Sequence, residues 1–139
     1  MAEKITNTGQ YKLLLFFKRN PAIDRAEFKA YYEANHAPLI MEVAKQAKGL
    51  LRYTRRYLDH EASDPALKNP FTTFGPLVPT IDFDMVNEVT FSSKADAQEF
   101  ERALYGIQEN AAKALTDEKM LFDPKMMRGM VVEEVVSIV

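Results

Sequence analysis

One short segment near the N-terminus, YKLLLFFKR (Tyr11 to Arg19), constrains the fold more than any other. If it is a strand, its successive side chains point to opposite sides. Positions 13, 15 and 17 are apolar, and so are positions 14 and 16 between them. A strand that is apolar on both sides must be buried on both sides. We therefore expect a sheet that is covered on each of its faces.

A helix is predicted directly after this strand and the turn NPAI. Asp24 can cap its first turn, and Glu27 follows three residues later, as in a capping box. Ile23 and Phe28 are spaced as a hydrophobic staple across the same helix start. The helix is predicted to run from about Asp24 to Lys48, just before Gly49, with a break near Pro38.

The rest of the chain repeats this alternation. Ser93 and the acidic residue three positions later predict the start of a second helix, which Gly106 interrupts before a further helical stretch, NAAKALTDEKML. Bulky apolar and aromatic residues predict three more strands, at Leu50–Leu58, Asp84–Phe91 and Met130–Val139.

The resulting order is βαββαβ, which is the ferredoxin-like pattern of the α+β class. Right-handed crossovers place both helices on one face of a four-stranded antiparallel sheet. The chain of 139 residues is expected to form one domain, 1–139, with a flexible N-terminus at 1–10. Because the helices cover only one face, we expect a second copy of the chain to cover the other, giving a homodimer and a dimeric α+β barrel.

Residues 59–84 form a long predicted loop that contains four prolines. Its apolar side chains, among them Phe71 and Phe74, have little reason to remain in water. Loops of this length in a compact domain are often functional covers. We interpret the segment as a lid over a pocket, and a linker is the alternative.

Composition excludes several classes of function. The net charge of −2 lacks the basic character of a nucleic-acid binder. There is no cysteine, which excludes thiolate nucleophiles and cysteine metal sites, and two histidines make a histidine-rich metal site implausible. No Gly-rich phosphate loop or GxSxG motif is present. The N-terminal residues are polar and no apolar run reaches the ~20 residues that span a bilayer, so we expect a cytoplasmic protein without a membrane partner.

The stretch AYYEANHAPLI, residues 30–40, holds the main candidate for chemistry. Phe28, Tyr32, His36 and Ile40 are spaced by four and lie near one stripe of a helix. If Pro38 ends the first helical segment, His36 lies where free carbonyl groups favour the imidazolium, while burial opposes it. This balance suits a proton-transfer residue, and a purely structural histidine is the alternative.

Other candidates are weaker. Tyr32 lies one turn before His36, where it can orient the histidine or bind a phenolic substrate, and Tyr53 can line the pocket. Arg55 shares a strand face with Tyr53 and can meet a carboxylate. Asn87 and Glu88 point to opposite faces of an apolar strand, so one of them should face the pocket. Glu88 is then either an ion-pair partner or a second catalytic group.

His60 begins the long loop, and it becomes a partner for His36 only if that loop folds over the pocket. The seven methionines suggest adaptable packing around an apolar ligand, although ordinary core packing explains them equally well.

The segment YKLLLFFKRNPAIDRAEFKAYYEANHAPLI resembles the opening of the EthD domain family, with Phe28, the paired tyrosines, His36 and the following Ala-Pro-Leu in register. LLRYTRRY, DMVNEVTFSSKADAQEF and FDPKMMRGMVVEE extend the resemblance over nearly the whole chain, and residues 59–84 are its least similar part. The resemblance implies a dimeric α+β barrel and small-molecule chemistry without a metal or organic cofactor. The only residue to which the resemblance assigns a clear role is His36, which it implies is an acid or base.

EthD-like proteins of fungal aromatic-polyketide pathways include decarboxylases and dehydratases. The resemblance therefore implies a cofactor-independent lyase that acts on an aromatic polyketide-like molecule. Two alternatives stay open: a cofactor-free anthrone or quinol oxygenase or a polyketide cyclase, and a non-catalytic module that binds an apolar small molecule.

Overall fold

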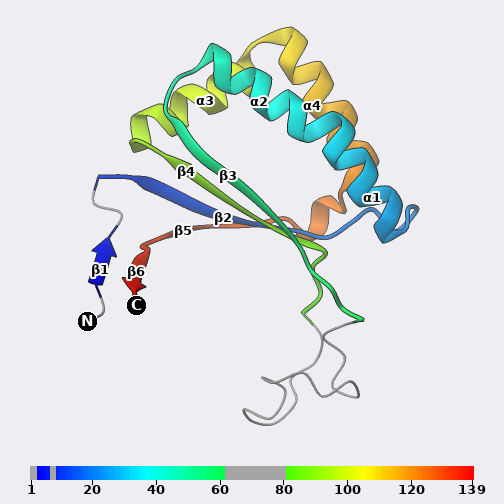
Figure 1. The fold of residues 1–139 in the computed structure, drawn as a ribbon. Helices are drawn as coiled ribbons and strands as arrows, with labels where there is room; N and C mark the ends of the chain where they lie inside the picture. The colour runs from blue at the N-terminus through cyan, green and yellow to red at the C-terminus, as the bar shows by residue number, and fades with distance from the viewer. Residues whose placement is uncertain (1–2, 7–8, 62–80) are drawn as a thin grey trace.

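The computed structural model describes residues 3–6, 9–61 and 81–139, and its centre is a four-stranded antiparallel sheet (Figure 1). The strand order is β3-β4-β2-β5, and every neighbouring pair is antiparallel. Together with the helices this is the predicted ferredoxin-like βαββαβ fold. The strands are β2 (Tyr11–Phe17), β3 (Leu50–Tyr57), β4 (Met85–Phe91) and β5 (Arg128–Val132).

All the helices of the described residues lie on one face of this sheet, as the sequence predicts (Figure 1). The first helical segment joins β2 to β3, and the second joins β4 to β5 through a short 3-10 turn at Pro124–Met126. The helices are α1 (Arg25–Tyr31), α2 (Ala37–Gln46), α3 (Lys94–Gly106) and α4 (Gln108–Leu121).

The predicted helix starts are confirmed. The Asp24 side chain accepts a hydrogen bond from the Glu27 backbone N–H at 2.8 Å. The Ser93 hydroxyl accepts one from the Asp96 N–H at 3.1 Å, and α3 ends at Gly106. Each cap satisfies a backbone donor that has no partner within the helix.

The predicted break near Pro38 takes a different form. Ala37 keeps helical angles (φ −60°, ψ −43°), and its N–H donates to Tyr32 O, five residues back. Tyr32–His36 is thus one π-helical turn, called the π turn below, between α1 and α2. Proline lacks an N–H and its ring collides with the carbonyl four residues earlier, and the wider turn accommodates both without ending the helix. The expectation that His36 lies at a helix end is therefore wrong.

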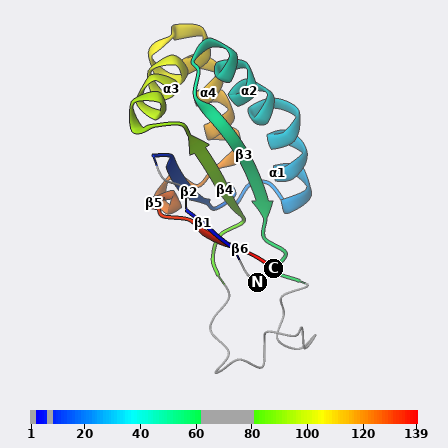
Figure 2. The same cartoon turned by 60° about the vertical axis from the view of Figure 1, so that its left-hand side comes forward.

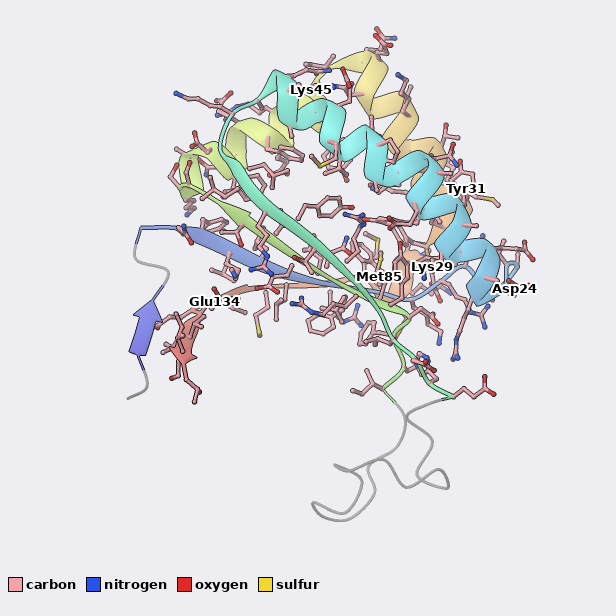
Figure 3. The ribbon with its side chains drawn as sticks, viewed as in Figure 1. Asp24, Lys29, Tyr31, Lys45, Met85 and Glu134 are labelled. Carbon is pink, nitrogen blue, oxygen red and sulfur yellow. The ribbon has the colours of Figure 1, made fainter. Side chains whose placement is uncertain are left out.

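The predicted C-terminal strand Met130–Val139 is also different, because it is divided in two. β5 pairs with β2, and after Glu133 and Glu134 the chain continues as β6 (Val135–Ile138). Glu134 Oε2 lies 2.6 Å from Lys12 Nζ, an ion pair that anchors the chain between the two strands. Glu134 is labelled in Figure 3 at this end of the molecule.

A further short strand, β1 (Glu3–Thr6), lies within the first ten residues, for which the sequence predicts a flexible terminus. It pairs antiparallel with β6, so that the two ends of the described chain lie side by side (Figure 2). The pairing is possible because β6 extends past the main sheet and offers a free edge.

The hydrophobic core lies between the sheet and the helices. Tyr32, Phe28, Met85, Leu121 and Val43 are its largest fully buried side chains. Figure 3 shows Met85 on the sheet beneath the helix that carries Tyr31. On the opposite face of β2 lie Leu14 and Phe16, which are half-buried, and no described helix covers that side (Figures 1 and 2).

Candidate functional site

A half-open cavity of about 580 Å³ lies on the helix-covered face of the sheet. Its size falls within the range of small-molecule sites. The walls are mostly apolar, and the charged residues Lys94, Glu101, Glu118 and Arg128 also line the cavity. Its apolar lining includes Leu13, Leu15, Val89, Ile40, Phe100 and Phe122.

His36 lines this cavity from the end of the π turn. It is buried, and its Nδ1 lies 3.0 Å from Oδ2 of Asp117 on α4. Because a carboxylate accepts, Nδ1 carries the proton, and Nε2 is the nitrogen left to meet a molecule in the cavity. The hydroxyl of Tyr31 donates to the other carboxylate oxygen, Asp117 Oδ1, at 3.1 Å. Asp117 is therefore held between two donors.

The π turn also brings Tyr32 against His36. Their ring centroids are 5.1 Å apart in an edge-on arrangement, and both rings line the cavity. The sequence predicts these two residues on one stripe of a regular helix, and the wide turn sets their actual positions.

Three polar side chains form a hydrogen-bonded chain along the cavity wall. Asn87 Nδ2 donates to the Tyr32 hydroxyl oxygen at 2.8 Å, and the Tyr32 hydroxyl is hydrogen-bonded to that of Tyr53. Burial raises the pKa of Tyr32 to about 12, and burial also raises the pKa of Tyr53. Both tyrosines are therefore protonated at neutral pH.

Arg55 supports this chain from β3. Its Nε and Nη2 bind the two carboxylate oxygens of Glu33 at 2.7 and 2.8 Å, and its guanidinium lies 4.7 Å from the centroid of the Tyr53 ring. The hydrogen bonds from Arg55 hold the pKa of Glu33 below its usual range, although partial burial opposes this. Tyr57 donates to the same carboxylate. The carboxylate that Arg55 meets is thus one of the protein's own.

Glu88 lies on the other face of β4, away from the cavity. Lys12 Nζ is 2.7 Å from Oε1 and Arg56 Nη1 is 2.6 Å from Oε2. Hydrogen bonds from Lys12 lower the pKa of Glu88 to about 2, with Arg56 contributing and burial opposing. The sequence does not decide which of Asn87 and Glu88 faces the pocket. In the structure Asn87 faces the cavity, and Glu88 forms the ion pair.

The remaining predicted residues lie elsewhere. His60 Nε2 is 2.9 Å from Ile81 O, at the base of the long loop, and His60 is not among the cavity residues. Phe71, Phe74 and the rest of the predicted lid between 62 and 80 lie outside the described residues.

Sequence reasoning missed Asp117. A signal was present, because Ala114, Asp117 and Leu121 follow a helical spacing of three and four, and both apolar members are fully buried. This places the carboxylate on the inward face of α4. Nothing in the sequence, however, indicates that this face meets His36.

In the ranges 3–6, 9–61 and 81–139, no three His, Asp or Glu side chains converge as metal ligands would. No helix in those ranges is long and apolar enough to cross a membrane.

Comparison with known proteins gives both sequence and structural matches. The model of the EthD domain matches residues 20–125. No curated protein sequence matches this chain. A crystal structure of an ethyl tert-butyl ether d (EthD) family protein from Bacillus halodurans is similar, with 18% identity, a TM-score of 0.55, and coverage of 90% of this chain and 98% of that one.

Two other similar structures are of dimeric proteins. One is a dimeric protein with a ferredoxin-like fold from Bacteroides fragilis, with 9% identity, a TM-score of 0.51 and coverage of 91% and 96%. The other is a dimeric ferredoxin-like protein from Thermobifida fusca, with 7% identity, a TM-score of 0.50 and coverage of 91% of each chain. At these identities the likeness concerns the fold alone.

Proposed function

This chain belongs to the EthD domain family, and we propose that it is a cofactor-independent lyase, a decarboxylase or a dehydratase, acting on an aromatic polyketide-like small molecule. His36 is the proton shuttle of this reaction. The observation that carries the proposal is the buried His36–Asp117 pair, which lies beside an apolar cavity of about 580 Å³.

The pair supplies what a proton shuttle needs. Asp117 accepts the Nδ1 proton, which fixes the tautomer and leaves a lone pair on Nε2. When Nε2 takes a proton, the carboxylate stabilises the resulting imidazolium. The hydrogen bond from Tyr31 holds the carboxylate in place during both steps.

Either reaction can proceed with this one shuttle. In decarboxylation, Nε2 first takes the proton that ionisation of the substrate's carboxylic acid supplies. A β-keto acid then loses carbon dioxide, the electrons of the broken bond form an enolate, and the imidazolium protonates its carbon. In an ortho-hydroxy aromatic acid the imidazolium protonates the ring carbon first, and carbon dioxide then leaves as the electrons of the broken bond restore the aromatic ring. In both cases His36 returns to its neutral form. In dehydration of a β-hydroxy ketone, Nε2 takes the α-proton, the enolate expels the hydroxyl group, and the imidazolium donates the proton that makes it water.

Two other functions use the same cavity. A cofactor-free oxygenase or a cyclase would also begin with removal of a proton by His36, and oxygen consumption identifies the oxygenase. A binding module needs only the apolar walls. The buried carboxylate behind His36 favours an enzyme over a module, since burying an ionisable pair is costly and a simple apolar carrier gains nothing from it.

We also propose that the chain is a homodimer. The helix-free face of the sheet carries Leu14 and Phe16 of β2 and Met130 of β5 beside the Lys12–Glu88 ion pair. The similar proteins from B. fragilis and T. fusca are dimeric. A cytoplasmic location remains a prediction.

The proposal is tested with wild-type protein and the His36→Ala variant. Both are incubated with hydroxylated aromatic acids and with β-hydroxy ketones, with and without oxygen. We expect turnover in both atmospheres that is lost in His36→Ala, with release of carbon dioxide or loss of the mass of water. His60→Ala is the matched control and should retain activity, because His60 lies outside the cavity. Unchanged turnover in a folded His36→Ala protein would overturn the role of His36.

A further inference from the structure

The hydrogen bonds that link Asn87, Tyr32 and Tyr53 all point the same way, from donor to acceptor. The proposed proton shuttle makes no use of them. Asn87 donates to the Tyr32 oxygen, so that oxygen acts as an acceptor. Tyr32 is almost fully buried, with 1% of its surface exposed, and its own proton needs an acceptor. Within the described residues, the only other hydrogen-bond partner of the Tyr32 hydroxyl is the hydroxyl of Tyr53.

It follows that Tyr32 donates to Tyr53. The Tyr53 hydroxyl has one proton, and it does not donate that proton to Tyr32. Tyr53 lines the cavity, and no other hydrogen bond from its hydroxyl occurs among the described residues. Its proton is therefore available to a molecule in the cavity, in a chain whose members polarise one another.

Asn87 shows that this arrangement has a cost in stability. It is 3% exposed in a strand that is otherwise largely apolar, and its Oδ1 has no hydrogen-bond partner within the described part of the chain. A valine at this position would avoid that cost. What the amide contributes is the hydrogen bond to Tyr32, which sets the direction of the chain.

The Tyr53 ring is also fixed in orientation. The Arg55 guanidinium lies over it, and Arg55 is itself held by two hydrogen bonds to Glu33. A cation over a phenol ring draws charge from it and makes the hydroxyl a stronger donor.

We propose that the Tyr53 hydroxyl binds the substrate oxygen on which negative charge develops, and that Tyr32 and Asn87 are positioning residues that direct its proton into the cavity. This deepens the proposed function and rests on it. As His36 removes a proton from carbon, or as carbon dioxide leaves, the electrons move onto a carbonyl oxygen, and a preorganised donor stabilises that charge. The substrate class is thereby narrowed to β-keto acids, β-hydroxy ketones and phenols. In each of these, the oxygen that Tyr53 binds is bonded to the carbon next to the reacting carbon.

The test uses two small probes that need no turnover. 4-Nitrophenolate has an anionic oxygen, and nitrobenzene has a similar ring without it. Tyr53→Phe removes a hydrogen bond to a charged oxygen, so we expect it to weaken nitrophenolate binding by roughly tenfold to a hundredfold. Nitrobenzene binding should change less than about threefold, because the apolar walls are intact. Tyr32→Phe should weaken nitrophenolate binding less, since Tyr53 keeps its hydroxyl and loses only its orientation.

Tyr57→Phe is the matched control. Tyr57 lies on the same face of β3, and its hydroxyl donates to Glu33 outside the cavity lining. Removal of this hydroxyl should change nitrophenolate binding less than about threefold, because Arg55 keeps both of its hydrogen bonds to Glu33. Equal nitrophenolate affinity in wild type and Tyr53→Phe would overturn the inference, as would equal losses for both probes or no nitrophenolate binding by the wild type.

The two proposals fail in different ways. If wild-type protein turns over none of the candidate substrates, the proposed function fails, while Tyr53-dependent binding of nitrophenolate still supports the oxyanion donor. If His36-dependent turnover is found, Tyr53→Phe should lower kcat by about 10²–10³-fold with a smaller change in KM. Wild-type kcat in that variant would overturn this inference and leave the role of His36 intact.

Discussion

At the scale of single residues, Asp117 is the group whose role is most readily separated from substrate binding. It touches His36 and does not line the cavity. Asp117→Asn keeps the side-chain shape but removes the charge that stabilises the imidazolium. We expect kcat to fall by roughly one to two orders of magnitude with KM nearly unchanged. Steady-state kinetics measures both constants.

Tyr31→Phe is the control for that change, because it removes the other hydrogen bond to Asp117 and keeps the carboxylate. A smaller loss of kcat is expected there. An Asp117→Asn protein with wild-type kcat would show that His36 does not need the carboxylate.

Glu88 offers a prediction about stability and pH. Its pKa is lowered to about 2 in the folded protein by Lys12 and Arg56, so its ion pairs add stability above the unfolded value of about 4.3, and this contribution is lost as pH falls toward 2. Glu88→Gln should lower the free energy of unfolding by roughly 2–3 kcal/mol at pH 7. The deficit should shrink steadily below about pH 4.5.

Urea denaturation of both proteins at one protein concentration, at pH 7 and at the lowest pH where both still fold, measures the deficit. Glu99→Gln, which changes an exposed ion pair on α3, is the matched control and should cost less than 1 kcal/mol. A Glu88→Gln deficit that does not vary with pH would mean that packing, and not charge, is responsible.

The sequence predicted some of these residues and not others for a physical reason. Tyr32 and His36 follow from spacing on one helix, which is a local property. The partnership of His36 with Asp117 joins segments 81 positions apart, and the Asn87–Tyr32 hydrogen bond joins segments 55 positions apart. A single sequence contains no record of which inward faces meet, so such pairs require the three-dimensional fold.

At the scale of elements, the turn from α2 into β3 depends on Gly49. Its φ is +105°, and a Cβ at this position would collide with the Asp96 side chain at the start of α3. Gly49→Ala should therefore lower the free energy of unfolding by about 2 kcal/mol or more. Chemical denaturation measures it.

Gly9→Ala is the comparison for Gly49. Gly9 also has a positive φ, +79°, but no atom lies within 4 Å of its added Cβ. It should cost about 1 kcal/mol, the price of the backbone conformation alone. Equal losses of unfolding free energy in the two variants would show that the contact with Asp96 contributes nothing to the effect.

The elements also show where local signals are sufficient. Caps at Asp24 and Ser93 were predicted because each is encoded within four residues. The π turn was not, because Pro38 requires only that the regular hydrogen bonding be interrupted. An ended helix and a widened turn both meet that requirement, and the packing of Tyr32 and His36 between the sheet and α4 is compatible with the second. At the division of the last strand, Glu134 likewise contacts a distant residue, Lys12, which lies 122 positions away.

At the scale of the whole molecule, the two apolar sides of β2 have different surroundings. The side with Leu13 and Leu15 packs against the helices and lines the cavity. The side with Leu14 and Phe16 has no described helix over it, and Met130, which is opposite Leu14 in the strand register, is 65% exposed. The second copy of the chain that we propose would complete the burial of both sides, which the sequence predicts.

This yields the final prediction, which concerns the dimer. Met130→Lys places a charge on β5 within the proposed interface, where an unpaired charge is costly to desolvate. We expect the wild-type protein to sediment as a dimer and the variant to dissociate with a Kd raised at least about a hundredfold, which corresponds to roughly 3 kcal/mol. Met41→Lys changes a residue of similar exposure on α2, within the helix layer, and should leave the dimer intact. Because the cavity lies on the helix side of the sheet, the dissociated variant should still bind nitrophenolate through Tyr53. A monomeric wild type would show that the helix-free face is covered in some other way, whereas dissociation by both variants would place the contact on the helices.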